Sequence, residues 1–174
     1  MRTLLLSASF LVLAGVSGAS AHATFEVKEA AAGSTYKAVL RVPHGCDGQA
    51  TLKVRVSIPD GVYNVKPMPK AGWTLETVTG AYAKPFENHG TTVTEGVREI
   101  VWTGELADAH YDEFVFRGSL GKDLAADSML YVPVVQECAN GAERWIQVPA
   151  EGQKDSDLDY PAPGIRIAPA KAGH

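Results

Sequence analysis

Short runs in which apolar and polar residues alternate recur along most of this chain, and they restrict it to β structure. The runs are rich in Val, Thr, Tyr, Phe and Trp, as is typical of strands that bury one face. Gly, Pro and Asn turns separate them, for example PHG at 43–45 and NG at 140–141. We expect strands within seven segments: 35–42, 50–59, 73–79, 99–104, 111–118, 130–137 and 144–149.

Seven to nine short strands in about 150 residues predict an all-β chain that forms a single β-sandwich of immunoglobulin-like or cupredoxin-like kind. The sequence shows no amphipathic helix of three turns and no internal repeat. We expect the sandwich to span residues 22–150. Residues 151–174 are rich in Pro, Ala and charged residues, which predicts an extended, partly loose tail. The segment 163–167 could add one edge strand.

The first 21 residues have the organisation of a secretory signal peptide. Arg2 supplies the positive charge, residues 4–16 are apolar, and ASA at 19–21 is a small-residue cleavage site. The apolar run is shorter than the roughly 20 residues that span a bilayer, and no second such run follows. We therefore expect a periplasmic or otherwise extracytoplasmic protein that begins at His22 and has no membrane anchor after cleavage.

Charge and motifs narrow the function further. The chain carries 16 basic and 20 acidic side chains, with no Lys/Arg cluster along the sequence, which argues against nucleic acid or anionic membrane as a partner. The G-x-S-x-G, H-E-x-x-H, P-loop and G-x-G-x-x-G patterns are all missing, so no catalytic constellation is evident.

Two cysteines, Cys46 and Cys138, lie far apart in the sequence beside turn residues. In an oxidising export compartment such a pair predicts one disulfide. A Cu(I) site made by the two thiolates is the alternative, although neither a C-x-x-C spacing nor a methionine cluster accompanies them.

His22 gains a new chemistry if cleavage makes it the first residue. A free α-amine and the imidazole Nδ1 of the same residue can close a six-membered chelate ring around one metal ion, whereas an internal histidine offers an amide in place of the amine. Both donors lose their protons readily to a metal near neutral pH, and two nitrogen donors suit Cu(II). A cleavage site that falls before a histidine by chance is the alternative.

A carboxylate is the most obvious further ligand, and the segment 111–118 offers two. Strand alternation puts Asp112 on the face of Phe114, and Glu113 on the opposite face. A solvent-facing Glu113 paired with Arg117 is the structural alternative.

The chain resembles the bacterial YcnI-like family, a domain formerly of unknown function that has been linked to copper. The resemblance extends from His22 to about Ile167. It rests on HATFEVKEAAAGSTYKAVLRVPHGCDG at the mature start, VRVSIPDGV, VKPMPKAGW, EGVREIVWTG, YDEFVFRGSL, LYVPVVQECANGAERWIQVPA and PAPGIRI.

The resemblance implies a β-sandwich that binds one Cu(II) through a monohistidine brace. His22 would supply amine and imidazole, and Glu113 a carboxylate, with Asp112 as the substitute. Trp145 would lie against the metal, with Trp102 as its competitor. Relative to the family, this chain adds the cysteine pair, which looks like the disulfide of a subgroup, and lacks the C-terminal membrane helix of some members.

This donor set favours Cu(II) over Cu(I), and it lacks the thiolate of a blue-copper electron carrier. It predicts a non-enzymatic metallochaperone that buffers, stores or hands copper to a partner protein. Three alternatives remain: a small periplasmic copper-resistance β-barrel, a metal-independent interaction domain, and a copper monooxygenase. The monooxygenase needs a second histidine ligand, for which the sequence offers His44, His89, His110 and His174.

Overall fold

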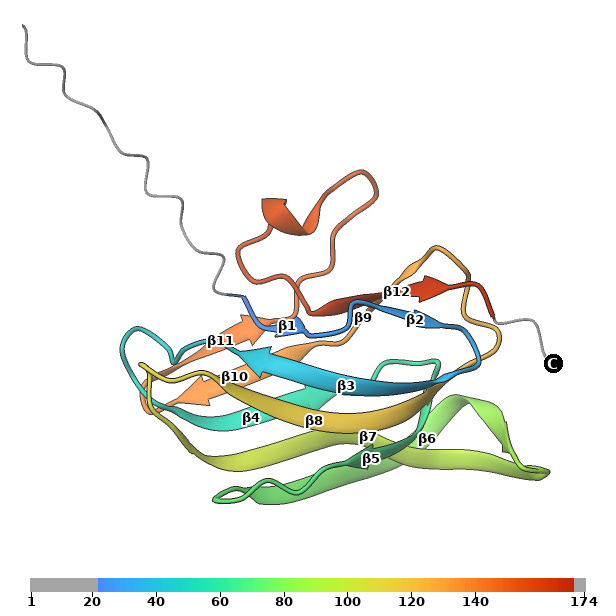
Figure 1. The fold of residues 1–174 in the computed structure, drawn as a ribbon, viewed down its shortest axis with the longest axis horizontal. Helices are drawn as coiled ribbons and strands as arrows, with labels where there is room; N and C mark the ends of the chain where they lie inside the picture. Colours follow the sequence, from blue (N-terminus) through green and yellow to red (C-terminus); the bar gives the residue numbers. More distant parts are fainter. Residues whose placement is uncertain (1–21, 171–174) are drawn as a thin grey trace, which may run out of the picture.

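A computed structural model of the chain describes residues 22–170, which form a sandwich of two antiparallel sheets with a small third sheet beside it (Figure 1). In spatial order, the first sheet contains β1 (Thr24–Phe25), β3 (Thr35–Val42), β8 (Asp112–Leu120) and β5 (Val62–Pro67). The second contains, also in spatial order, β11 (Gly141–Trp145), β10 (Val134–Cys138), β4 (Thr51–Ser57), β7 (Thr91–Leu106) and β6 (Thr74–Asn88). In the third, β12 (Gly164–Ala168) lies between β2 (Glu29–Ala31) and β9 (Met129–Tyr131).

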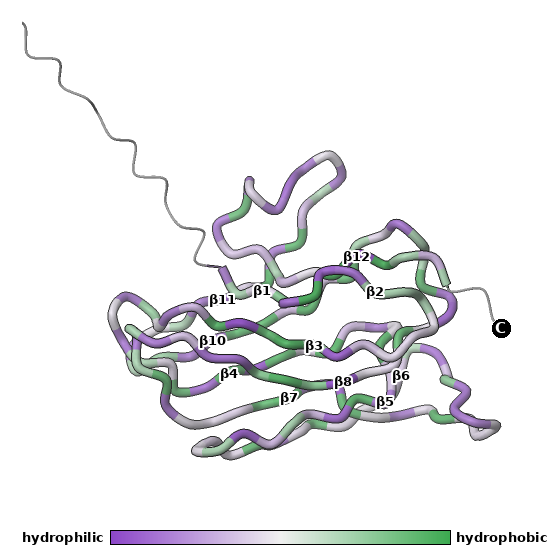
Figure 2. Tube along the Cα trace, viewed as in Figure 1, coloured by the Kyte–Doolittle hydropathy of each residue, from purple (hydrophilic) through white to green (hydrophobic). Residues whose placement is uncertain are grey.

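The core lies between the two large sheets. Leu40 of β3 and Phe114 of β8 face Val54 of β4 and Trp102 of β7, and all four side chains are fully buried. Hydrophobic residues recur along these central strands, with polar residues between them (Figure 2). The alternation seen in the sequence is therefore the alternation between core and solvent faces.

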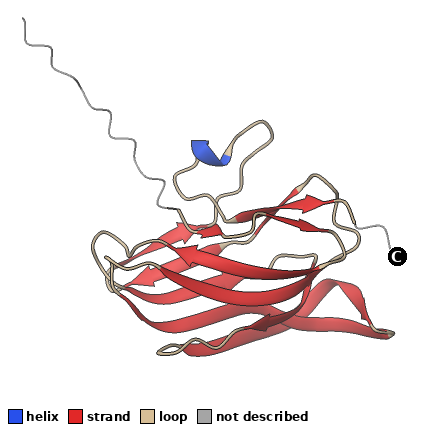
Figure 3. Ribbon diagram, viewed as in Figure 1, coloured by secondary structure: helices blue, strands red, loops and turns tan. Residues whose placement is uncertain are grey.

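The all-β sandwich expected from the sequence is confirmed, and strands dominate the described residues (Figure 3). Twelve strands and one short 3-10 helix, η1 (Asp155–Asp157), form among residues 22–170. The count exceeds seven to nine because β1, β2 and β9 have only two or three residues each, too few for a period-two signal. Residues 1–21, expected as the signal peptide, lie outside the described residues.

The strand that the sequence suggested at 163–167 is present in the C-terminal segment, but its position in the sheet differs from the expectation. This strand is β12, which lies between β2 and β9 and is therefore not an edge strand. Ile165 and Ile167 are buried in the main core. Because their apolar side chains belong to the hydrophobic core of the sandwich, the folded domain extends well past residue 150. The loop that carries η1 projects from the body beside β1 (Figure 1).

The predicted disulfide is present. Cys46, in the loop before β4, is bonded to Cys138 at the end of β10, and their Cα atoms are 6.1 Å apart. Among the described residues, no helix has the length and apolar character needed to cross a bilayer.

Candidate metal centre

The first described residue, His22, lies against Trp145. Their ring centroids are 5.5 Å apart, with the planes tilted by 56°. The register that begins with Thr24 opposite Arg41 holds the chain after His22 at the edge of the first sheet. Ala23 and Phe25 are buried, whereas His22 is partly exposed, so its imidazole lies at the rim of the sandwich and within reach of solvent.

A buried polar network fixes Trp145. The indole Nε1 donates to Oε1 of Gln136 at 3.3 Å, and Gln136 Nε2 donates to the backbone oxygen of His44 at 2.5 Å and to Thr51 Oγ1 at 2.7 Å. Gln136 and Thr51 have no exposed surface. The indole has a further aromatic neighbour, since the Tyr160 ring centroid lies 5.4 Å away. The tryptophan that contacts His22 is therefore held in one orientation.

The disulfide adjoins this network. Cys46 Sγ lies 3.9 Å from the backbone oxygen of Gln136, and Cys138 pairs with Thr51 across β10 and β4. The disulfide thus ties the 44–46 loop to the end of β10. The same loop contains the His44 oxygen that accepts the hydrogen bond from Gln136 Nε2.

A cavity of about 290 Å³ opens beside His22. Thr24 and Lys28 line it from the N-terminal segment, and Asp155 and Ser156 line it from the loop that carries η1. Asp155 accepts a hydrogen bond of 3.0 Å from the hydroxyl of Tyr131. Partial burial, helped by this carboxylate, raises the pKa of Tyr131 above its ordinary value. The cavity gives a ligand access to the imidazole.

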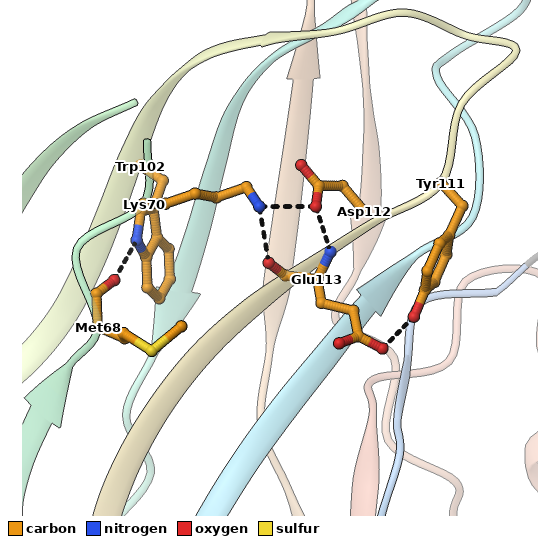
Figure 4. A network of polar contacts seen from close by, with 6 residues as sticks. All are labelled: Met68, Lys70, Trp102, Tyr111, Asp112 and Glu113. Atoms are coloured by element: carbon orange, nitrogen blue, oxygen red, sulfur yellow. Dashed lines mark hydrogen bonds and ion pairs between the residues drawn. The ribbon is translucent and has the colours of Figure 1, made fainter. Parts of the chain in front are cut away.

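Glu113 and Asp112 project to opposite sides of β8, as expected (Figure 4). Asp112 lies on the side of the buried Phe114. Its Oδ1 accepts from Lys70 Nζ at 2.6 Å and from the backbone nitrogen of Glu113 at 2.8 Å. Lys70 Nζ also donates to the backbone oxygen of Glu113 at 3.2 Å and lies 5.3 Å from the centre of the Phe114 ring. Asp112 is therefore tied to Lys70.

The Glu113 carboxylate lies on the outer face of the first sheet. It accepts a hydrogen bond from the hydroxyl of Tyr111 and lies 3.5 Å from Arg41 Nε. Its cationic partner is therefore Arg41, whereas the sequence alternative paired it with Arg117. Partial burial, followed by the hydrogen bond to Glu113, raises the pKa of Tyr111. The Glu113 side chain remains 38% exposed, so solvent can reach it.

The register shows how these residues lie relative to one another. Thr24, Arg41 and Glu113 are paired in sequence across β1, β3 and β8 and form one row on the outer face. The structure thus brings His22 and Trp145 together, and it leaves β3 between β1, which begins two residues after His22, and β8, which carries Glu113.

The competing residues lie elsewhere. Trp102 is fully buried, packs on Phe114 and donates to the backbone oxygen of Met68 at 3.3 Å (Figure 4). His89, with a φ of 50°, lies in the turn between β6 and β7 and is exposed.

His44 and His110 lie in two different loops. His110 is exposed in the loop before β8, and its backbone nitrogen bonds to the oxygen of Ala107. His44 is partly buried, and its Nδ1 lies 2.6 Å from the oxygen of Gly45. His174 lies outside the described residues.

Among residues 22–170, no three or more His, Cys, Asp or Glu side chains are grouped so as to hold a metal ion. A monohistidine brace needs only one imidazole, its own amine and one carboxylate, so it does not require such a group. His22 and Glu113 are donors of the kind that Cu(II) prefers, and both are accessible. The donor chemistry therefore fits copper.

Sequence reasoning missed Gln136 and Arg41. A glutamine within a strand ordinarily suggests a solvent-facing position, and Gln136 is instead fully buried. Arg41 bridges Glu26 at 3.0 Å and Glu113 at 3.5 Å, a pairing that depends on a register that the sequence does not display. The only available signal for Gln136 was the apolar character of its neighbours, Val134 and Val135.

The fold and this rim site define a class of protein, a disulfide-containing β-sandwich of immunoglobulin-like kind. A solved structure of an uncharacterised protein from Nocardia farcinica, described as having an immunoglobulin-like fold, matches with a TM-score of 0.61 and 23% identity over 86% of this chain and 99% of that chain. Residues 22–167 match the profile of DUF1775, a domain of unknown function, and the chain belongs to this family.

A second solved structure, of a protein from Corynebacterium diphtheriae described as membrane-anchored, has a TM-score of 0.39 and 11% identity, and the match covers 87% of this chain and 35% of that one. The comparison with curated proteins gave no match.

Proposed function

We propose that this chain is an exported Cu(II)-binding protein that buffers copper, stores it or delivers it to another protein. Copper is its cargo. One observation carries the proposal: the residue that signal-peptide cleavage would leave at the N-terminus lies against a rigidly held indole, at the rim of the fold and beside a cavity.

The proposed ligands are the amine and imidazole of His22 and the carboxylate of Glu113. Glu113 reaches the metal by leaving Arg41, which keeps Glu26 as an alternative partner at 3.0 Å. A Glu that exchanges one partner for another loses little, because exposed ion pairs contribute at most about 1 kcal/mol. Trp145 shields one side of the imidazole and is not a ligand.

We further propose that the protein is exported and that it binds and transfers copper without catalysing a reaction. The disulfide between Cys46 and Cys138 suits an oxidising compartment, and a cleaved signal peptide at residues 1–21 would expose the His22 amine. A single imidazole among the donors suits binding and transfer of Cu(II).

Tryptophan fluorescence tests the site directly. Cu(II) quenches a nearby indole, so adding it to the mature protein should quench emission at one equivalent. Trp145→Phe should remove most of that quenching and leave the affinity almost unchanged. The matched control is Trp73→Phe, which replaces an indole packed on Phe114 and should leave the copper-dependent quenching intact. Equal quenching in both variants would contradict the proposed position of the metal.

The ligands are tested by a set of titrations. His22→Ala should abolish tight binding, and Glu113→Gln should weaken it and change the electron paramagnetic resonance spectrum. Glu26→Gln is the matched control, because it removes the other carboxylate that pairs with Arg41. If Glu26→Gln weakened binding and Glu113→Gln did not, the carboxylate assignment would be wrong.

A further inference from the structure

Three cations form a straight row on the outer face of the first sheet. Arg117 of β8 is paired with Lys37 of β3 on one side and with Lys66 of β5 on the other, so the three side chains lie on one face. All three are exposed. Like charges directly opposite one another across strands are unfavourable, so such a row costs the fold stability.

The charge of the row is not balanced within residues 22–170. None of these three side chains forms an ion pair or side-chain hydrogen bond with another residue of that part of the chain, whereas Arg41, on the same face, is paired with two carboxylates. The chain carries more acidic than basic side chains overall. The carboxylates that could neutralise this row are therefore placed elsewhere.

An apolar strip runs beside the cations. Val115 is two residues from Arg117 along β8, and the backbone nitrogen of Met68 donates to the Val115 oxygen at 2.8 Å. Met68 is 52% exposed. The cations and this strip line a groove of about 360 Å³, whose other walls include Pro67 and Pro69. The groove thus combines a charged row with an exposed apolar edge.

We propose that this groove, lined by Lys37, Lys66, Arg117, Met68 and Val115, is the docking site for an acidic, extended segment of a partner protein. Carboxylates of the segment would neutralise the cations, and one of its apolar side chains would cover Met68. Charge complementarity selects this occupant, since the row presents three positive charges without a counterion among the described residues.

A narrow acidic segment fits better than an anionic lipid surface. Glu26 and Glu113 lie on the same face of the sheet as the cationic row, and a flat anionic surface over the row would also approach these carboxylates. A segment that follows the groove can avoid them.

The position of the groove suggests that the docked partner exchanges copper with this protein. This part of the inference rests on the proposed copper function. Glu113 and Arg117 are four residues apart on β8, or about 13 Å at the usual strand rise. A partner seated in the groove would lie next to the proposed copper site, as a donor or acceptor of the metal must.

The docking test needs no copper. Metal-free, isotopically labelled mature protein is titrated with acetylated hexaglutamate, with hexaglutamine of the same length as the uncharged control, and amide shifts are followed by nuclear magnetic resonance. Hexaglutamate should shift amides of β3, β5 and β8 around the row and lose its affinity as salt rises. Hexaglutamine should leave these amides unchanged.

Variants locate the site. Arg117→Gln should weaken hexaglutamate binding by about fivefold, and the triple Gln variant of the row should abolish it. Arg144→Gln is the matched control, because it removes an exposed arginine from β11 of the other sheet. A glutamate peptide with one central leucine should bind more tightly than hexaglutamate, and Met68→Ser should remove that gain.

Several results would overturn the docking proposal: no binding of hexaglutamate, equal binding by wild type and the triple variant, or binding to phosphatidylglycerol vesicles without binding to the peptide. Copper titrations of the same variants separate the two proposals. Arg117→Gln should bind copper like wild type. A protein that binds hexaglutamate at the row and does not bind copper would keep the docking site and contradict the proposed function.

Discussion

Replacing Gln136 by leucine tests the buried network that holds Trp145. Leucine is close to glutamine in size, so the substitution leaves little cavity and removes only polar atoms. It leaves three groups without their partner: the Trp145 indole N–H, the backbone oxygen of His44 and the hydroxyl of Thr51. An unsatisfied buried donor or acceptor costs about 1 to 3 kcal/mol.

The 3.3 Å bond from Trp145 is long, and its loss should lie at the low end of that range. We therefore expect Gln136→Leu to lower the free energy of unfolding by about 3 to 7 kcal/mol in total. Urea unfolding followed by far-ultraviolet circular dichroism measures this difference, and it avoids a tryptophan signal that the mutation itself changes.

The control is Gln153→Leu, at an exposed glutamine whose side-chain oxygen accepts a hydrogen bond from the backbone nitrogen of Ala150. It should change the free energy of unfolding by less than about 0.5 kcal/mol. Adding Thr51→Val to Gln136→Leu should cost less than Thr51→Val costs alone, because the hydroxyl has already lost its partner. A loss below about 1 kcal/mol for Gln136→Leu would refute the reasoning.

Three further predictions concern stability. Replacing both Cys46 and Cys138 by alanine should lower the free energy of unfolding by about 4 kcal/mol, measured in urea, because the bond closes a loop with a sequence separation of 92; an unchanged midpoint would argue against it. Burial raises the pKa of Tyr36, so the neutral phenol's contribution to the free energy of unfolding is complete below about pH 10 and is lost as pH rises further. Above that pH, the free energy of unfolding should fall less steeply with pH for Tyr36→Phe than for wild type, and identical pH dependence would contradict this. Arg117→Gln should raise the free energy of unfolding at low salt by roughly 0.5 kcal/mol, by relieving repulsion in the cationic row, and the gain should shrink with added salt; a loss of stability would count against the row.

The strands that alternate cleanly were predictable from the sequence. Residues 35–42 form β3 with the expected bounds, although Val39, on the outer face, is buried as well and departs from strict alternation. The opposed faces of Phe114 and Glu113 also followed from alternation. The segment 130–137 divides into β9 and β10, with Pro133 between them, since proline has no N–H for a ladder hydrogen bond.

The sequence suggested the strand at 163–167, whereas its central place in the third sheet and its burial were not predicted. Residues 151–163 have the composition of a loop, and this composition concealed the burial of Ile165 and Ile167. A three-residue partner such as β2 or β9 has no periodicity of its own. Strand order, which places β12 between the two, depends on long-range packing that local composition does not encode.

Individual residues of the candidate site were predictable from the sequence, whereas their contacts with residues on other strands were not. The position of His22 after the cleavage site, and the family resemblance that pointed to Trp145, led to two residues that the structure places together. The partners of Glu113 and the cationic row depend on register across three strands. Lys37, Lys66 and Arg117 are far apart in the sequence, so no basic cluster was visible there.

The most direct measurement is a Cu(II) titration with electron paramagnetic resonance on protein processed to begin at His22, beside the same protein with one extra residue ahead of it. The two samples differ in the α-amine and keep every side chain of the sandwich. Tight one-to-one binding with nitrogen and oxygen ligation, lost in the extended protein, is the predicted result. Equal binding by both samples would contradict the brace and would make His22 incidental to the function of this domain.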